Sequence, residues 1–197
     1  ACVLIIFLSN EIFNLSFNFK NEFFQIFLGS SFMFILGLID DLFQINPFIR
    51  LISQFLIASI VFMKGLSFNV IDLSLINSNL FYPLTQNINY IFSIFWIVGI
   101  TNAINWIDGL DGLASGICAI LFSSLFIVNI LNQNYVISIL CLGVIGCCIG
   151  FLKYNSYPAK IFMGDGGSYF LGFFFASVSL ISDAKDILCV SDPSLTK

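Results

Sequence analysis

The chain has 197 residues, of which 59% are apolar and only 9% are charged, and its mean hydropathy is +1.02. Soluble domains carry roughly 25% charged residues, so this composition excludes a soluble globular protein and indicates an integral membrane protein. A net charge of −4 without a basic patch excludes nucleic-acid binding, because that function needs cations to neutralise phosphates.

The apolar runs predict an all-α fold, a polytopic transmembrane helix bundle, because each approaches the ~20 residues that a span needs. An N-terminal stub at 1–8 precedes about six expected spans, at 23–39, 48–66, 90–107, 113–131, 135–152 and 169–182. The link at 67–89 carries Pro83 and is expected to be a loop with a short interfacial segment. We interpret 1–197 as a single transmembrane domain, truncated at both ends, because the chain starts inside an apolar run and ends in a polar stretch.

Carboxylates are costly near bilayer depth and by default mark a functional site. Two expected spans separate Asp41 from Asp108, and two more separate Asp111 from Asp165. An even number of crossings returns the chain to the same side of the membrane. We therefore predict that all five carboxylates emerge on one face, where a single active site is topologically allowed. They are Asp40, Asp41, Asp108, Asp111 and Asp165.

The phrase NAINWIDGLDGLASG places Asn102, Asn105, Asp108 and Asp111 three residues apart. At about 3.6 residues per helical turn, the first and last of these would lie on opposite faces of an ideal helix. They can share a site only if the helix breaks, and Gly109 or Gly112 allows that break. The alternative is a polar helix end followed by a glycine-rich turn.

The other two acidic phrases are GLIDD, ending in Asp40 and Asp41, and KIFMGDGGS, around Asp165. Taken alone, the Asp pair could be an interfacial stop signal. The glycines beside Asp165 suit close approach of phosphate oxygens at a helix start. Lys160 could offset phosphate charge or anchor the chain at the interface, and Phe162 could belong to the core or stack on a base.

A set of carboxylates and amides in a chain with no histidine indicates a hard cation. Mg²⁺ is typically held by one or two carboxylates and the phosphates of a substrate. We therefore predict Mg²⁺, with Mn²⁺ as the alternative ion, at a site that binds a diphosphate.

GLIDD (37–41), NAINWIDGLDGLASG (102–116) and PAKIFMGDGGSYFLGF (158–173) together resemble the polyprenyl-phosphate N-acetylhexosamine-1-phosphate transferase family. The resemblance implies a bacterial multi-pass enzyme of the plasma (inner) membrane, with its site on the cytoplasmic face. Such enzymes transfer a sugar 1-phosphate from a UDP-N-acetylhexosamine to polyprenyl phosphate and release UMP. The short link after Asp41 favours the GlcNAc-1-phosphate branch, with phospho-MurNAc-pentapeptide transferase as the alternative. Homodimer formation is left open.

By motif position, the resemblance implies that Asp165 is the principal Mg²⁺ ligand. Asp40 and Asp41 would serve the lipid phosphate or the metal, with one of them acting as a base and Asp41 as the second metal ligand. Phe162 would stack on uracil. The predicted substrate-binding residues are Asn102, Asn105, Asp108, Asp111, Lys160 and Phe162.

Three alternatives stay open. A cation- or proton-coupled transporter would also use intramembrane carboxylates, but would spread them through bilayer depth. A fragment or pseudoenzyme without activity is the second, because the family's C-terminal loop bearing histidine or arginine has no histidine counterpart in this chain. The third concerns mechanism, since direct attack and a route through an aspartyl intermediate need the same residues.

Overall fold

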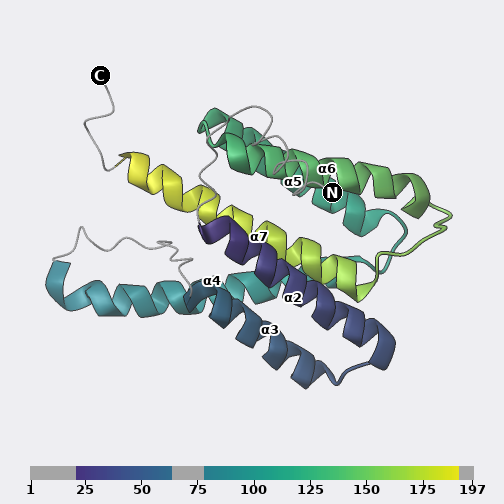
Figure 1. Cartoon of the computed structure of the whole chain (residues 1–197), viewed down its shortest axis with the longest axis horizontal. Coiled ribbons are helices and arrows are strands. Elements are labelled where there is room, and N and C mark those ends of the chain that lie inside the picture. Colours follow the sequence, from purple (N-terminus) through teal and green to yellow (C-terminus); the bar gives the residue numbers. More distant parts are fainter. Residues whose placement is uncertain (1–20, 64–77, 191–197) are drawn as a thin grey trace.

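The computed structural model describes the backbone of residues 21–63 and 78–190, and the side chains of 24–61 and 87–182. This part of the chain is entirely helical and contains no strand, as predicted (Figure 1). The predicted stub at 1–8, the first part of the link at 67–77 and the end of the polar tail lie outside the described residues. The helices are α2 (Asn21–Phe43), α3 (Pro47–Met63), α4 (Ser78–Ile107), α5 (Leu113–Leu131), α6 (Tyr135–Asn155) and α7 (Gly164–Val190).

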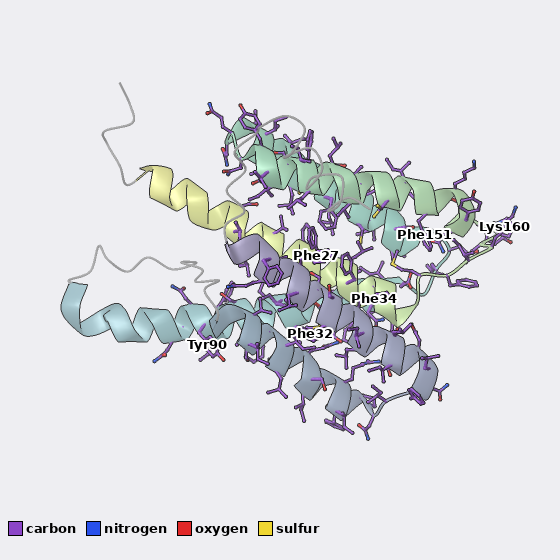
Figure 2. The ribbon with its side chains drawn as sticks, viewed as in Figure 1. Phe27, Phe32, Phe34, Tyr90, Phe151 and Lys160 are labelled. Carbon is purple, nitrogen blue, oxygen red and sulfur yellow. The ribbon has the colours of Figure 1, made fainter. Side chains whose placement is uncertain are left out.

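Four segments of the described helices are long and apolar enough to cross a membrane. They are Phe24–Phe43, Asn87–Ile107, Leu113–Leu131 and Tyr135–Asn155. The 17-residue α3 is shorter than a typical span of ~20 residues. Large apolar side chains point out of the bundle all along these helices, among them Phe27, Phe32 and Phe34 of α2 (Figure 2). Lipid is the solvent that such a surface requires.

The helix boundaries differ from the prediction in two places. Residues 78–89, expected to lie in a loop, form the first turns of α4. Pro83 misled the prediction: as the sixth residue of α4 it removes one intrahelical hydrogen bond, and the helix continues through it. Likewise, α7 begins at Gly164 and not at residue 169, so the glycines around Asp165 belong to its first turn.

Helix α7 is the centre of the bundle and packs against α2, α4 and α5. Figure 1 shows it running between α2 and the α5–α6 hairpin. Its side chains Tyr169 and Phe173 are completely buried, and Phe174 and Phe175 contact the ring of Phe122 on α5 at centroid distances of 5.9 and 5.6 Å. Helix α7 is therefore held by three neighbouring helices.

Three chain reversals lie at one end of the bundle, at 44–46, 108–112 and 156–163. In the first, Asn46 caps α3 by accepting a hydrogen bond from the amide of Phe48 at 2.9 Å, and Pro47 opens the helix. In the second, Gly112 has φ of 71° and breaks α4 from α5, as predicted. The 132–134 turn between α5 and α6 is at the opposite end.

Candidate active site

The carboxylate of Asp41, at the end of α2, caps the start of α7. Its Oδ1 accepts a hydrogen bond from the amide of Asp165 at 3.0 Å, and its Oδ2 accepts one from the amide of Gly166 at 3.2 Å. These amides lack intrahelical partners, and the helix dipole favours an anion there. Two motifs 124 residues apart are thus joined directly.

Close contact between the backbones makes this cap possible. A Cβ added at Gly37 would collide with the backbone carbonyl of Asp165, and one at Gly164 would lie 2.8 Å from Oδ2 of Asp41. Gly164 also has φ of 70°, a left-handed conformation that glycine adopts without strain. The glycines of GLIDD and of MGDGG therefore let α2 and α7 meet at the carboxylates.

The side chain of Asp165 points to α4. Its Oδ1 accepts a hydrogen bond from Nδ2 of Asn105 at 2.6 Å, and the same amide nitrogen lies 3.0 Å from Oγ of Ser168. Since Asn105 is near the end of α4, the third polar phrase of the sequence also reaches the cluster. The structure thus brings Asp41, Asn105 and Asp165 together at one end of the bundle.

Asp40 is buried, with 6% of its surface exposed, and is paired with a cation. Its Oδ2 lies 2.9 Å from Nη1 of Arg50 on α3, and its Oδ1 accepts a hydrogen bond from the amide of Ile45 at 2.9 Å. Arg50 also approaches Oδ2 of Asp165 at 4.0 Å and lies over the ring of Tyr169. The sequence analysis did not select Arg50, although it is the first basic residue after the Asp pair.

An open pocket of about 380 Å³ lies over this group of charges. The residues that line it are Asp40, Asp41, Gln44, Ile45, Arg50 and Asp165. Its walls are polar, and three carboxylates face one guanidinium, so the pocket carries an excess of negative charge. Such a pocket favours a cation, or an anion that arrives together with one.

Asp108 lies in the turn after α4, beside this cluster. Burial, with the negative charges of Asp165 and Asp41 added, raises its pKa from 3.8 to about 6. The repulsion means that Asp108 belongs electrostatically to the same site, although no hydrogen bond joins it to the others. A bound cation would relieve the repulsion.

Asp111 and Asn155 hold the loop at 156–163 against the α4–α5 turn. Oδ2 of Asp111 accepts a hydrogen bond from the amide of Ala159 at 3.0 Å. Buried Asn155 accepts hydrogen bonds from the amide of Gly112 and from Oγ of Ser115, both at 3.1 Å, and donates one to the carbonyl of Ile161 at 2.9 Å. The sequence analysis missed Asn155, which no motif rule marks.

Two predicted substrate residues lie on that loop and face outward. Phe162 is 75% exposed, and Lys160 is also exposed, at the end of the bundle where α6 joins α7 (Figure 2). An exposed phenylalanine beside a polar site is not part of the core, so the structure removes that alternative for Phe162. Its ring is free to receive a planar group.

Asn102 is placed one helical turn deeper than the carboxylates. Its Nδ2 donates to Oε1 of Gln54 at 2.6 Å and to the carbonyl of Val98 at 2.8 Å. It therefore contacts α3 and its own helix, and no hydrogen bond joins it to the described side chains of the acidic cluster. Its predicted role in substrate binding gains no support from this position.

The carboxylates of the pocket lie far enough apart that a hard cation would need further ligands. Within the described part of the chain, no group of three or more carboxylate, His or Cys side chains is gathered closely enough to hold a metal ion alone. Mg²⁺, however, usually takes only one or two carboxylates and completes its shell with substrate phosphates and water. Oδ2 of Asp165, which faces Arg50 at 4.0 Å, is available for that role. The residues fit a cation that is shared with a phosphate ligand.

The described helices therefore form a membrane helix bundle with carboxylates and one arginine gathered into a polar pocket at a single end. The chain belongs to glycosyl transferase family 4, whose sequence profile matches residues 23–183. This confirms the resemblance drawn from the three motifs and extends it on both sides.

Named relatives fall into two groups. The chain is 37% identical over 169 residues to the probable undecaprenyl-phosphate N-acetylglucosaminyl 1-phosphate transferase of Bacillus subtilis, covering 83% of this chain and 45% of the relative. It is 50% identical over 91 residues to the phospho-N-acetylmuramoyl-pentapeptide-transferase of Enterococcus faecalis, covering 46% of this chain and 28% of that relative. The match to the enzyme of that name from Prochlorococcus marinus is 37% over 170 residues, with 77% and 45% covered. The chain spans less than half the length of these relatives.

Proposed function

We propose that the protein containing this chain transfers N-acetylglucosamine 1-phosphate from UDP-GlcNAc to undecaprenyl phosphate and releases UMP, at the start of cell-envelope glycan synthesis. In the overall reaction, an oxygen of the lipid phosphate becomes bonded to the phosphorus that carries the sugar, either directly or after an aspartate oxygen has first been bonded there. A new P–O bond forms, the bond from that phosphorus to the bridging oxygen breaks, and UMP leaves with the electron pair. The observation that carries this proposal is the meeting of Asp41, Asn105 and Asp165 at one end of the bundle.

The negative pocket supports a role for Mg²⁺, held by Asp165 and, second, by Asp41 together with substrate phosphate. Both oxygens of Asp41 accept backbone hydrogen bonds, but each keeps a second lone pair for another partner. Mg²⁺ or Mn²⁺ held by these carboxylates would offset the negative charge that develops as the diphosphate is cleaved.

The residues of the chain orient the reactants around that centre. Asn105 fixes the carboxylate of Asp165 by its 2.6 Å hydrogen bond. Arg50, held by Asp40, offers a second cation at the pocket floor for the acceptor phosphate. Asp40 would accept the proton of a protonated acceptor, although its pairing with Arg50 makes it a weak base. A one-step attack and a route through an aspartyl intermediate are both compatible with these positions.

The donor would lie along the exposed loop. Phe162 presents a free ring for uracil, and Lys160 a cation for the diphosphate. Asp108 and Asp111, in the turn that faces this loop, would bind the uridine and sugar hydroxyls. Because nucleotide sugars are made in the cytoplasm, the site would face the cytoplasmic side of a bacterial plasma membrane.

Phospho-MurNAc-pentapeptide transfer is the second candidate. The observation that favours it is the higher local identity, 50% over 91 residues, to relatives of that name. Both reactions use the same acceptor and the same leaving group. They differ only in the sugar, so the choice of donor separates them.

The experiment uses membranes containing the full-length protein, supplied with undecaprenyl phosphate, Mg²⁺ and UDP-GlcNAc labelled in the sugar. Label entering the lipid with an equal amount of UMP supports the proposal. Transfer only from UDP-MurNAc-pentapeptide keeps the family and changes the donor. Ion-dependent uptake into proteoliposomes without UMP release would instead support a transporter, and silence with every donor would overturn the transferase assignment.

A further inference from the structure

A buried hydrogen bond joins α3 to α4 one turn below the acidic cluster. Oε1 of Gln54, whose side chain is fully buried, accepts from Nδ2 of Asn102 at 2.6 Å. Gln54 lies in the apolar part of α3, where a buried glutamine side chain is costly unless it is hydrogen-bonded. A hydrogen bond between two membrane helices can fix their relative rotation, which lipid does not do because it supplies no hydrophobic force between them.

The two residues stand directly beneath two site residues. Gln54 follows Arg50 by four positions on α3, and Asn102 precedes Asn105 by three positions on α4. At these spacings each pair shares a helix face, with about one turn of 5.4 Å between its members. The chain of α3 runs away from the site and that of α4 runs toward it, so Gln54 and Asn102 both lie about one turn farther from the site. Their contact therefore lies beneath the contacts that Arg50 and Asn105 make with Asp165.

Those upper residues both reach the same carboxylate. Asn105 donates to Oδ1 of Asp165 at 2.6 Å, while Arg50 approaches Oδ2 at 4.0 Å. A small rotation of α3 against α4 would therefore change the distance from Arg50 to Oδ2 of Asp165 and the distance from Asn105 to Oδ1 by different amounts. Placement errors of about 1 Å at a reacting centre can cost about 100-fold in rate.

Helix α4 is fixed on its other side. A Cβ added at Gly172 of α7 would lie 2.6 Å from the Cα of Thr101, so the two backbones touch beside Asn102. α3 has fewer buried contacts, with Ile52 and Leu56 exposed on its outer face. Besides the edge-to-face contact of Phe55 with Phe95 at 5.4 Å, the hydrogen bond to Asn102 is a directional contact that can set how α3 sits on a fixed α4.

We propose that Gln54 and Asn102 are a positioning pair, which sets the rotation and depth of α3 against α4 and so places Arg50 and Asn105 around Asp165. This inference rests on the proposed function, since it concerns the geometry of that reaction. Nε2 of Gln54 has no hydrogen-bond partner in the described structure, so the residue is imperfectly satisfied in its buried position. If the pair served stability alone, two apolar residues at these positions would stabilise the protein as well or better.

The test compares Gln54→Leu, Asn102→Leu and the double variant with wild type in the full-length protein. Each is expected to lower kcat by about 10- to 100-fold while KM for the donor changes by no more than about twofold, because binding groups remain in place. The melting temperature of the double variant should stay at or above that of wild type, because both polar groups have been removed together. Ser53→Ala, whose hydroxyl bonds only within α3 on its exposed side, is the matched control.

Rescue adds a readout that a general packing role would not produce. The exchange of Gln54→Asn with Asn102→Gln keeps the combined length and the chemistry of the bond. We expect it to recover most of the lost kcat, although each single exchange leaves the pair too short or too long. Failure of the exchange together with a matching loss of melting temperature would identify a packing role and overturn the proposal.

A distance measurement separates this inference from the proposed function. Spin labels at Phe48→Cys on α3 and Trp106→Cys on α4, both exposed positions, report the geometry of the two helix ends in an otherwise cysteine-free protein. Gln54→Leu should broaden or shift the distance distribution, and Ser53→Ala should not. An unchanged distribution overturns the positioning role, whether or not wild type proves to be a transferase; absent transfer by wild type overturns only the proposed function.

Discussion

Where α2 meets α7, backbone touches backbone, and Gly37, Asp41 and Asp165 are fixed by the helices themselves. Across the site, Asp111 accepts a hydrogen bond from the loop at 156–163 and Asn155 donates one to it, while the side chain of Phe162 on this loop is exposed. The first region has no freedom to adjust without moving a helix. The second can move by exchanging single hydrogen bonds.

The difference matches what the proposed phosphoryl transfer would demand. Charged groups around a reacting phosphorus must be held in place before the substrate arrives. Recognition of a nucleotide tolerates adjustment and can gain from it. We therefore expect substitutions at the α2–α7 contact to reduce kcat, and substitutions on the loop to raise KM for the donor.

The largest effect is expected at Asp165. Asp165→Asn keeps the shape and the contact with Asn105 but removes the charge that would hold a cation, so turnover should fall by about 1,000-fold or more. Label transfer into lipid measures it. The variant should reach the membrane at the wild-type level, and a variant that kept near-normal turnover would exclude Asp165 as a metal ligand.

A substitution that alters no charge should also disrupt the contact between α2 and α7. Gly37→Ala places a methyl group against the carbonyl of Asp165, so α2 must withdraw from α7 and the Asp41 cap is lost. We expect a loss of about 1–3 kcal/mol in stability and a fall of about 100-fold in kcat. Gly99→Ala is the control, because a methyl group there meets nothing within 4 Å. Equal behaviour of the two variants would contradict the close-contact account.

The loop region should respond through binding. Phe162→Ala removes an exposed ring, so we expect KM for the UDP-sugar to rise by about 10-fold, with kcat changed far less and stability unaffected. Initial rates over a range of donor concentrations measure this. Tyr157→Leu, at an 88% exposed ring on the same loop, is the comparison, and it should leave KM unchanged. A fall in kcat alone would place Phe162 in the chemical step.

The smallest effect concerns Asp108, which lies between the two regions. Its pKa is raised to about 6, so between about pH 4 and pH 6 the folded protein keeps a proton that the unfolded chain has lost. Its charge therefore lowers stability above about pH 6 and has no cost below about pH 4. Asp108→Asn should raise the melting temperature at high pH by a few degrees at most, since the group is partly solvated.

Thermal unfolding in EDTA at both ends of that pH range tests this expectation, with the exposed Asp111→Asn as the control. Mg²⁺ should reduce the benefit of Asp108→Asn, because a bound cation already offsets the repulsion. A gain of stability that is the same at low and high pH would mean that the charge of Asp108 is not its cause.

The sequence predicted this arrangement unevenly. Four of the six expected spans match helices that are long and apolar enough to cross a membrane. The placement of the carboxylates at one end of the bundle followed from counting crossings, which needs no knowledge of helix packing. The break at Gly112 followed from the incompatible spacing of Asn102 and Asp111 on one helix. These predictions depend on local composition and spacing, or on whether the number of membrane crossings is even. Both can be read from the sequence alone.

The partners of the carboxylates were not visible in this way. That Asp40 pairs with Arg50, or that Asn102 turns to Gln54 and not to the acidic cluster, depends on how α3 is rotated against α4. Asn155 carried no signal because one asparagine at the end of a span is also an ordinary polar boundary. Pro83 was misinterpreted, since its effect depends on the distance to a helix start that the sequence did not define.

The short turn at 132–134 has a practical consequence, because it lies across the bilayer from every residue of the site. A biotin-acceptor peptide inserted there would be labelled only from the compartment that the acidic cluster does not face. The accessibility of this one turn would thus establish which side of the membrane the acidic cluster faces.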